Sequence, residues 1–130
     1  MAAFDRATLD QLAEGEEIDI ETRAPDGAEP RRTTIWVAVD GEDVFVRSIH
    51  GTRGRWYRDL RANPEGAIHL LDGGQTPPIP VRAVPAADPE SVERATRAFE
   101  RKYAGDAALR TVVAAETFPS TLRLEPAQRP

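Results

Sequence analysis

Cysteine is absent from this chain, and histidine occurs only twice, at His50 and His69. Without cysteine, the protein has no disulfides, no thiolate metal sites and no thiol nucleophile. Two histidines so far apart in the sequence fit no standard zinc pattern. We therefore expect no metal site.

Long apolar runs are also missing, because no stretch approaches the roughly 20 residues of a membrane-spanning helix. The first residues, Met-Ala-Ala-Phe-Asp-Arg, lack the charged and then apolar layout of a secretory signal. The formal net charge of −5 argues against non-specific binding to nucleic acid or to a membrane surface. These absences lead us to expect a soluble cytoplasmic protein whose partners are neither nucleic acids nor membranes.

The composition is that of a globular domain. The 130 residues are 40% hydrophobic and 30% charged, and we find no internal repeat, linker or low-complexity segment. We therefore expect one domain over residues 1–130, with an N-terminal helix within 1–16 and a polar tail at 126–130. Asp5 is positioned to cap that helix.

Short runs of alternating apolar and polar residues predict strands. We expect six of them, at residues 17–23, 31–40, 43–49, 67–71, 79–84 and 121–125. Asp40-Gly41 is a typical tight turn and predicts a hairpin between the second and third strands. Pro80 and Pro85 cannot donate backbone hydrogen bonds, which predicts that the fifth strand lies at an edge or beside a bulge.

Helical spacing and start signals predict the remaining elements. Residues 55–61 form a short helix with Trp56 and Leu60 facing inward, and Asp88-Pro89 begins a long helix that ends near Gly105. A further helix is expected at 107–116. The whole predicts an α+β, mainly β fold, either a small barrel or a strongly twisted sheet with peripheral helices.

The stretch from the end of the third strand through the short helix is rich in arginine and glycine, although the chain as a whole is acidic. It holds Arg47, Ser48, Arg53, Arg55, Arg58 and Arg61. Within it, we expect residues 51–54, with Gly51 and Gly54 at their ends, to form an irregular loop, which we call the glycine loop. Guanidinium groups, hydroxyls and exposed backbone N–H groups together can bind a phosphate or a carboxylate. The alternative is that the arginines pair with some of the 22 acidic residues, which we favour for Arg58 and Arg61.

Three aromatic residues lie close to this loop in the sequence. Trp36, Trp56 and Tyr57 can form the wall of a site for a planar ring, or they can fill the core. His50 is the histidine placed for proton chemistry beside the loop, although no carboxylate partner for it is evident. His69 is interpreted as a structural residue, and Lys102-Tyr103 as packing residues or part of an interface.

The order of these motifs resembles the split-barrel superfamily that binds FMN or deazaflavin, which includes pyridoxamine-phosphate-oxidase-like proteins and deazaflavin-dependent nitroreductases. The matching residues are Gly27, Arg32, Thr34, Trp36, Asp40, Gly41, Arg47, Ser48, Gly51, Trp56, Tyr57, Leu60, Asn63 and Pro64. The chain resembles still more closely the bacterial domain-of-unknown-function 2255 family. The residues that carry this second resemblance are Arg47-Ser48, Gly51, Trp56-Tyr57-Arg58, Lys102-Tyr103 and Thr121-Leu122-Arg123-Leu124.

The superfamily resemblance implies a six-stranded split β-barrel, usually a homodimer, with a flavin or deazaflavin in a cleft beside the subunit interface. It implies that the cofactor phosphate meets Arg32, Thr34, Ser48 and the loop Gly51–Gly54. Trp36, Trp56 and Tyr57 would shape the ring and substrate pocket. The lysine that often follows the serine is replaced by Ile49-His50, and Arg53 is the candidate to supply its charge.

Three functions remain open at this point. The first is an oxidoreductase that uses FMN or deazaflavin on a small molecule. The second is a cofactor-free protein that binds a small anionic metabolite in the same cleft, and the third is a dimeric interaction module.

Overall fold

The computed structural model describes residues 3–24 and 29–127, and this part of the chain forms one curled sheet with helices around it. The strands are β1 (Ile18–Thr22), β2 (Arg31–Ile35), β3 (Ala38–Asp40), β4 (Asp43–Val46), β5 (Glu65–Leu70), β6 (Ile79–Pro85) and β7 (Leu122–Pro126). The helices are α1 (Arg6–Glu14), α2 (Arg55–Ala62), α3 (Pro89–Lys102) and the short α4 (Leu109–Val112), with 3-10 helices at Gly51–Arg53 and Ala115–Ser120.

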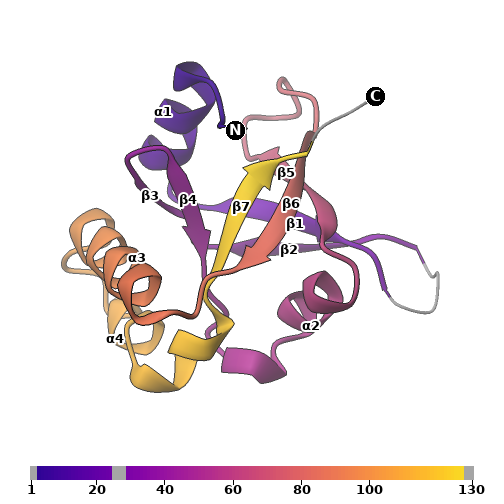
Figure 1. Ribbon diagram of the computed structural model, residues 1–130. Helices are drawn as coiled ribbons and strands as arrows, with labels where there is room; N and C mark the ends of the chain where they lie inside the picture. Colours follow the sequence, from indigo (N-terminus) through magenta and orange to yellow (C-terminus); the bar gives the residue numbers. More distant parts are fainter. Residues whose placement is uncertain (1–2, 25–28, 128–130) are drawn as a thin grey trace.

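All neighbouring strands are antiparallel, in the order β2-β1-β5-β6-β7-β4-β3. Figure 1 shows how far the sheet curls, because β1 and β2 run across the direction of β6 and β7. The α+β, mainly β fold class is therefore confirmed. No helix within the described ranges is long and apolar enough to cross a membrane.

The sheet has seven strands rather than the six expected, because the predicted strand 31–40 is two strands. β2 pairs with β1, whereas β3 pairs with β4 in the hairpin that Asp40-Gly41 predicts. At the break between them, the Val37 carbonyl accepts a hydrogen bond from Lys102 Nζ at 2.7 Å, and the Val37 N–H donates to the Tyr103 hydroxyl at 3.3 Å. Side chains from α3 and its C-cap thus replace the strand partners of this residue.

Of the two alternatives predicted for the strand with Pro80 and Pro85, an edge position or a place beside a bulge, the edge position is wrong, because β6 lies in the middle of the sheet between β5 and β7. Each proline faces a place where the neighbouring strand has ended. The Pro80 carbonyl points toward β7 and accepts from the N–H of Ala127, which lies beyond the end of that strand. Pro85 points to the opposite side, as Ala83 does, and the Ala83 N–H donates to the carbonyl of Pro64, which lies beyond the end of β5. Neither proline removes a bond from the paired part of a ladder.

The helix starts agree with the sequence, since Asp5 caps α1 through the Thr8 N–H and Asp88 caps α3 through the Ser91 N–H. Two other predictions need correction. The glycine loop is not irregular, because Gly51–Arg53 forms a 3-10 turn, and the helix predicted at 107–116 is reduced to α4. Gly27 and the last three residues of the tail lie outside the described residues.

Buried side chains form two clusters, one on each face of the β3–β4 hairpin. The first fills the curl of the sheet and includes Leu12 from α1, Val44 from β4 and Leu60 from α2. The second lies between the hairpin and α3 and includes Phe45 and Phe99. Packing within these two clusters places the ends of β2 and β4 near α2 and α4. The candidate site lies between these four elements.

Candidate functional site

A pocket of about 280 Å³ lies where the end of β2, the segment after β4, the start of α2 and α4 meet. We call it the Trp36–Trp56 pocket. Its lining residues are Glu17, Thr33, Thr34, Ile35, Trp36, Arg47, Ile49, His50, Trp56, Ala108 and Val112. The structure therefore brings together Thr34, Trp36, Arg47, His50 and Trp56 from the residues that the sequence singled out.

The two tryptophans form aromatic walls of this pocket, and each also belongs to the packed interior. Trp36 stacks on Tyr103 with ring centroids 3.7 Å apart and planes 3° from parallel. Trp56 is buried in the cluster inside the curl of the sheet. The alternatives of core residue and site wall are thus not exclusive, because one side of each indole packs while another part faces the pocket.

Arg47 is almost completely buried where it follows β4. Its guanidinium group donates to the hydroxyls of Thr121 at 2.9 Å and Thr96 at 3.0 Å, and to the carbonyls of Val112 and Val92, both at 3.2 Å. Burial lowers the pKa of Arg47 to about 10, so the group is still charged at neutral pH. No carboxylate of residues 3–24 or 29–127 forms a salt bridge with it. The pocket is therefore lined by the charge of Arg47, which pairs with no carboxylate of this part of the chain, and also by Glu17.

The glycine loop folds onto itself rather than offering its polar groups to the pocket. The Ser48 hydroxyl accepts the His50 N–H at 3.1 Å, and the Ser48 carbonyl accepts the Gly51 N–H at 3.0 Å. The Gly54 N–H in turn donates to Gly51, and a Cβ on Gly54 would overlap the Ser48 hydroxyl. Gly51 has φ +61°, and a Cβ there would lie 2.9 Å from the Glu116 carbonyl oxygen. The close approaches that these glycines permit are to the chain itself.

The other predicted site residues do not line this pocket. Arg32 is half-exposed and pairs with Asp19 at 3.1 Å, and the Thr34 hydroxyl donates to the same carboxylate. Arg53 is exposed to solvent. Tyr57 is buried, and its hydroxyl donates to the Pro119 carbonyl at 3.3 Å.

His50 lies at the rim of the pocket and is exposed, whereas His69 is tied to Glu21 at 2.7 Å. The interpretation of His69 as a structural residue agrees with this pairing. His50 forms a hydrogen bond through its backbone to Ser48, and its ring takes part in no hydrogen bond or ion pair with another described residue.

Lys102 and Tyr103 have a larger part in the structure than the sequence suggested. Lys102 Nζ donates to the carbonyls of Leu12 at 2.8 Å and Val37 at 2.7 Å, and burial lowers its pKa to about 8. The Tyr103 hydroxyl donates to the Glu16 carbonyl, and burial raises its pKa to about 12. Both residues connect the end of α3 to the segment at the end of α1 and to the β2–β3 break. Contacts between segments so far apart in the sequence cannot be predicted from a local pattern.

The lowered pKa of Lys102 predicts a dependence of stability on pH. Between the folded pKa of about 8 and the ordinary lysine value of about 10.4, the unfolded chain binds more protons than the folded one. The contribution of Lys102 to the free energy of unfolding therefore rises with pH across this interval and is lost as pH falls through 8. Urea titrations at pH 7 and pH 9.5 should show wild type gaining stability relative to Lys102→Met. A constant difference between the two proteins would contradict the lowered pKa.

Comparison with solved structures identifies the fold. The heme storage protein HutZ from Vibrio cholerae is similar, with a TM-score of 0.70, 17% identity, and coverage of 98% of this chain and 92% of that protein. A putative pyridoxamine 5'-phosphate oxidase from Listeria innocua has a TM-score of 0.61 and 16% identity, covering 93% of this chain and 90% of that one. An F420 reductase has a TM-score of 0.52 and 24% identity, with coverage of 92% and 93%.

These likenesses show the split-barrel fold, which agrees with the resemblance of the sequence motifs to the flavin- and deazaflavin-binding superfamily. No curated protein sequence matches the chain. A family model matches residues 8–124, which include β1 to β6, most of β7, all of α2 to α4 and both tryptophans of the pocket. The chain thus belongs to the family described as uncharacterized protein conserved in bacteria (DUF2255).

Proposed function

We propose that the Trp36–Trp56 pocket binds a small planar molecule that carries negative charge, and that the molecule is the flavin-type cofactor of an oxidoreductase. The observation that carries the proposal is the combination of two indole walls with the buried guanidinium of Arg47. Aromatic walls favour stacking with a planar ring. A charge without a carboxylate partner among the described residues favours an anionic ligand.

The pocket residues fit the ring system of FMN or a deazaflavin better than the candidate phosphate ligands fit its phosphate. Trp36 and Trp56 fit a ring system, with His50 at the rim. At the phosphate end, Arg32 and Thr34 are engaged by Asp19, and the loop N–H groups are used within the loop. Arg53 is exposed to solvent, and we propose that it turns toward the phosphate. A bound flavin supplies hydride transfer, while this chain supplies orientation and charge.

Two further observations support the cofactor. Proteins named as an F420 reductase and a putative pyridoxamine 5'-phosphate oxidase share the fold. Ile49, which lines the pocket, is 55% exposed, and Leu71 is the other large apolar side chain of the described residues with similar exposure. We propose that a second copy of the chain covers it in a homodimer, as in split barrels whose cofactor lies beside the subunit interface. Light scattering on wild type and Ile49→Asp tests this, because a dimer that buries Ile49 should dissociate in the variant.

A second candidate is a cofactor-free protein that binds a small anionic metabolite in the same pocket. The pairing of Asp19 with Arg32 and Thr34 favours it, because it removes two of the proposed phosphate ligands. So does the volume of about 280 Å³. Pockets for drug-sized ligands are larger, at about 300–1,000 Å³.

Absorbance and titration separate the two candidates. Under the cofactor proposal, purified protein absorbs between roughly 350 and 500 nm or binds added FMN or deazaflavin with a Kd in the micromolar range or below. Under the second candidate, both cofactors leave the tryptophan fluorescence unchanged, while a phosphorylated or carboxylated metabolite changes it.

Substitutions then test the residues. Trp36→Leu should weaken binding about 3- to 10-fold, since a stacked aromatic pair contributes about 0.5–1.5 kcal/mol beyond its buried area. Arg53→Ala should weaken FMN binding with little effect on folding, and unchanged affinity would remove Arg53 from the phosphate site. Arg58→Ala, an exposed arginine on α2, is the matched control and should leave binding unchanged.

A further inference from the structure

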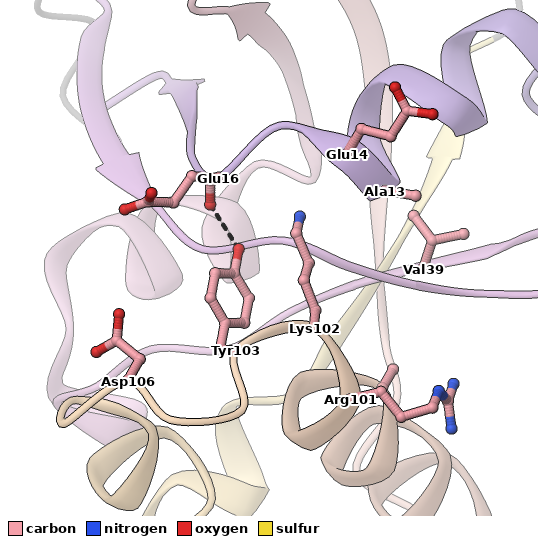
Figure 2. Close-up of a pocket in the computed structure, with 9 residues that line it drawn as sticks. Ala13, Glu14, Glu16, Val39, Arg101, Lys102, Tyr103 and Asp106 are labelled. Atoms are coloured by element: carbon pink, nitrogen blue, oxygen red, sulfur yellow. Dashed lines mark hydrogen bonds between the residues drawn. The ribbon is translucent and has the colours of Figure 1, made fainter.

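A second pocket lies on the other side of Tyr103, between the end of α1 and the end of α3, and it contains the only lysine of the chain. Of the 17 basic residues, Lys102 alone is not arginine. The pocket measures about 570 Å³ and is open to solvent on one side. Figure 2 shows the Lys102 side chain rising from α3 toward Ala13 and Glu14, with its amino group between the two helix ends.

The two hydrogen bonds of Lys102 can be made by a neutral amine as well as by an ammonium group. Its Nζ donates to two backbone carbonyls, those of Leu12 at 2.8 Å and Val37 at 2.7 Å. An ammonium group has three N–H donors and therefore keeps one without a partner among the described residues. A neutral amine has two N–H donors and one lone pair. Loss of the proton from Nζ therefore costs neither of the two hydrogen bonds. The lone pair takes the place of the third N–H.

The charges around the pocket define what it can take. Glu14 and Glu16 line it from the end of α1, Asp106 lines it after α3, and Arg101 is the other cation. Burial lowers the pKa of Lys102 to about 8, and Glu16 opposes this shift only in part. With Lys102 neutral, the lining of the pocket contains three carboxylates and one guanidinium group. The net charge of the lining is then negative, which disfavours the binding of anions.

We propose that Lys102 is a nucleophilic amine that forms an imine with a small uncharged aldehyde or ketone bound in this pocket. The lone pair of Nζ attacks the carbonyl carbon and forms a C–N bond, and the carbonyl oxygen takes up a proton. The oxygen then leaves as water with the two hydrogens that the nitrogen loses. The product is a C=N bond to Lys102, with no change of oxidation state. The proposal concerns a different pocket from the Trp36–Trp56 pocket and does not depend on what binds there.

Imine formation also has a structural consequence. The neutral imine has no N–H donor, so the carbonyls of Leu12 and Val37 both lose their hydrogen bonds from Lys102. An imine that takes up a proton from solvent has one N–H donor and still leaves one of the two carbonyls without its hydrogen bond. Val37 lies at the β2–β3 break beside Trp36, which stacks on Tyr103. Modified protein should therefore melt at a lower temperature than unmodified protein.

The test uses the variant Arg6→Lys, which adds one exposed lysine to the full chain as an internal reference. Arg6 lies at the start of α1 with 75% of its side chain exposed. The protein is treated at pH 7.5 with acetaldehyde and cyanoborohydride, which reduces imines to stable amines, and the modified peptides are quantified by mass spectrometry. Two pKa units below the ordinary lysine value give about 100-fold more free amine at this pH. We expect Lys102 to be labelled at least about tenfold faster than the reference lysine in this variant.

Three comparisons complete the test. The ratio of labelling at the two lysines should fall when anionic glyoxylate replaces acetaldehyde, because of the carboxylates around the pocket. Labelling at position 102 should disappear in Lys102→Arg, which keeps the charge and has no nucleophilic amine. The rate at Lys102 should rise to a plateau with a midpoint near pH 8. Slower labelling of Lys102 than of the reference lysine, or a rate still rising at pH 10, would overturn the proposal.

Discussion

Replacing Arg47 with alanine should lower the free energy of unfolding by about 3–5 kcal/mol, one of the largest effects expected for a single substitution in this chain. Four hydrogen bonds of the side chain join the segment after β4 to α3, to α4 and to Thr121, which directly precedes β7. Its guanidinium group also lies over the rings of Phe99 and Phe118, at 5.6 and 5.1 Å from their centroids. Alanine removes all of these contacts and leaves a cavity. Urea unfolding followed by tryptophan fluorescence measures the loss.

Two further variants separate packing from hydrogen bonding. Arg47→Met keeps an apolar side chain between the two phenylalanines. It leaves no buried carboxylate without a partner, because no described carboxylate pairs with Arg47. Its loss of stability should be about half that of Arg47→Ala. Arg58→Ala, an exposed arginine from the same basic stretch, should change stability by no more than about 0.5 kcal/mol. A loss for Arg47→Met equal to that of Arg47→Ala would show that the stem packing contributes nothing.

Arg47 also illustrates what the sequence could and could not predict. Its position at the end of the predicted strand 43–49 and among other arginines indicated an anion site. In the structure it is buried, and its partners Thr96, Val112 and Thr121 come from segments far along the chain. A local pattern gives the type and periodicity of residues. It does not show which distant segment covers them.

The same distinction explains the fold. The helix caps at Asp5 and Asp88 and the Asp40-Gly41 turn are local signals, and each appears in the structure as predicted. The β2–β3 break is a tertiary feature. The run Thr33–Val39 alternates as one strand, and only Lys102 and Tyr103, from α3 and its C-cap, divide it. The central position of β6 was missed for a similar reason, since the ends of its neighbours decide whether a proline can be accommodated.

The second large effect concerns the contact between the glycine loop and Ser48. In Gly54→Ala, the new Cβ would overlap the Ser48 hydroxyl and lie 3.1 Å from the Ser48 Cβ. The hydroxyl cannot simply turn away, because it accepts the His50 N–H at 3.1 Å. Overpacking of this kind costs about 1–3 kcal/mol. We expect a destabilisation in that range, measured by urea unfolding.

A double-mutant cycle tests this origin of the effect. Ser48→Ala alone loses one hydrogen bond, at about 0.5–1.5 kcal/mol, but it also removes the atom that the Gly54→Ala methyl would strike. In the double variant the overlap with the hydroxyl is gone, and only the 3.1 Å contact with the Cβ of residue 48 remains to be relieved by a small shift. The more rigid backbone at φ −60° recovers some stability by restricting the unfolded chain. The double variant should therefore be more stable than the sum of the single effects predicts, by about 1 kcal/mol or more.

Gly41→Ala is the matched control for the cycle. Gly41 has φ +63° and nothing within 4 Å of the position its Cβ would take, so alanine there meets backbone strain without a clash. Strain at a positive φ costs about 1–2 kcal/mol and does not involve Ser48. The effects of Gly41→Ala and Ser48→Ala should accordingly add, whereas those of Gly54→Ala and Ser48→Ala should not. Additivity in both pairs would mean that the loop relaxes around a larger residue, and Gly54 would then not be required for the fold of the 3-10 turn beside the pocket.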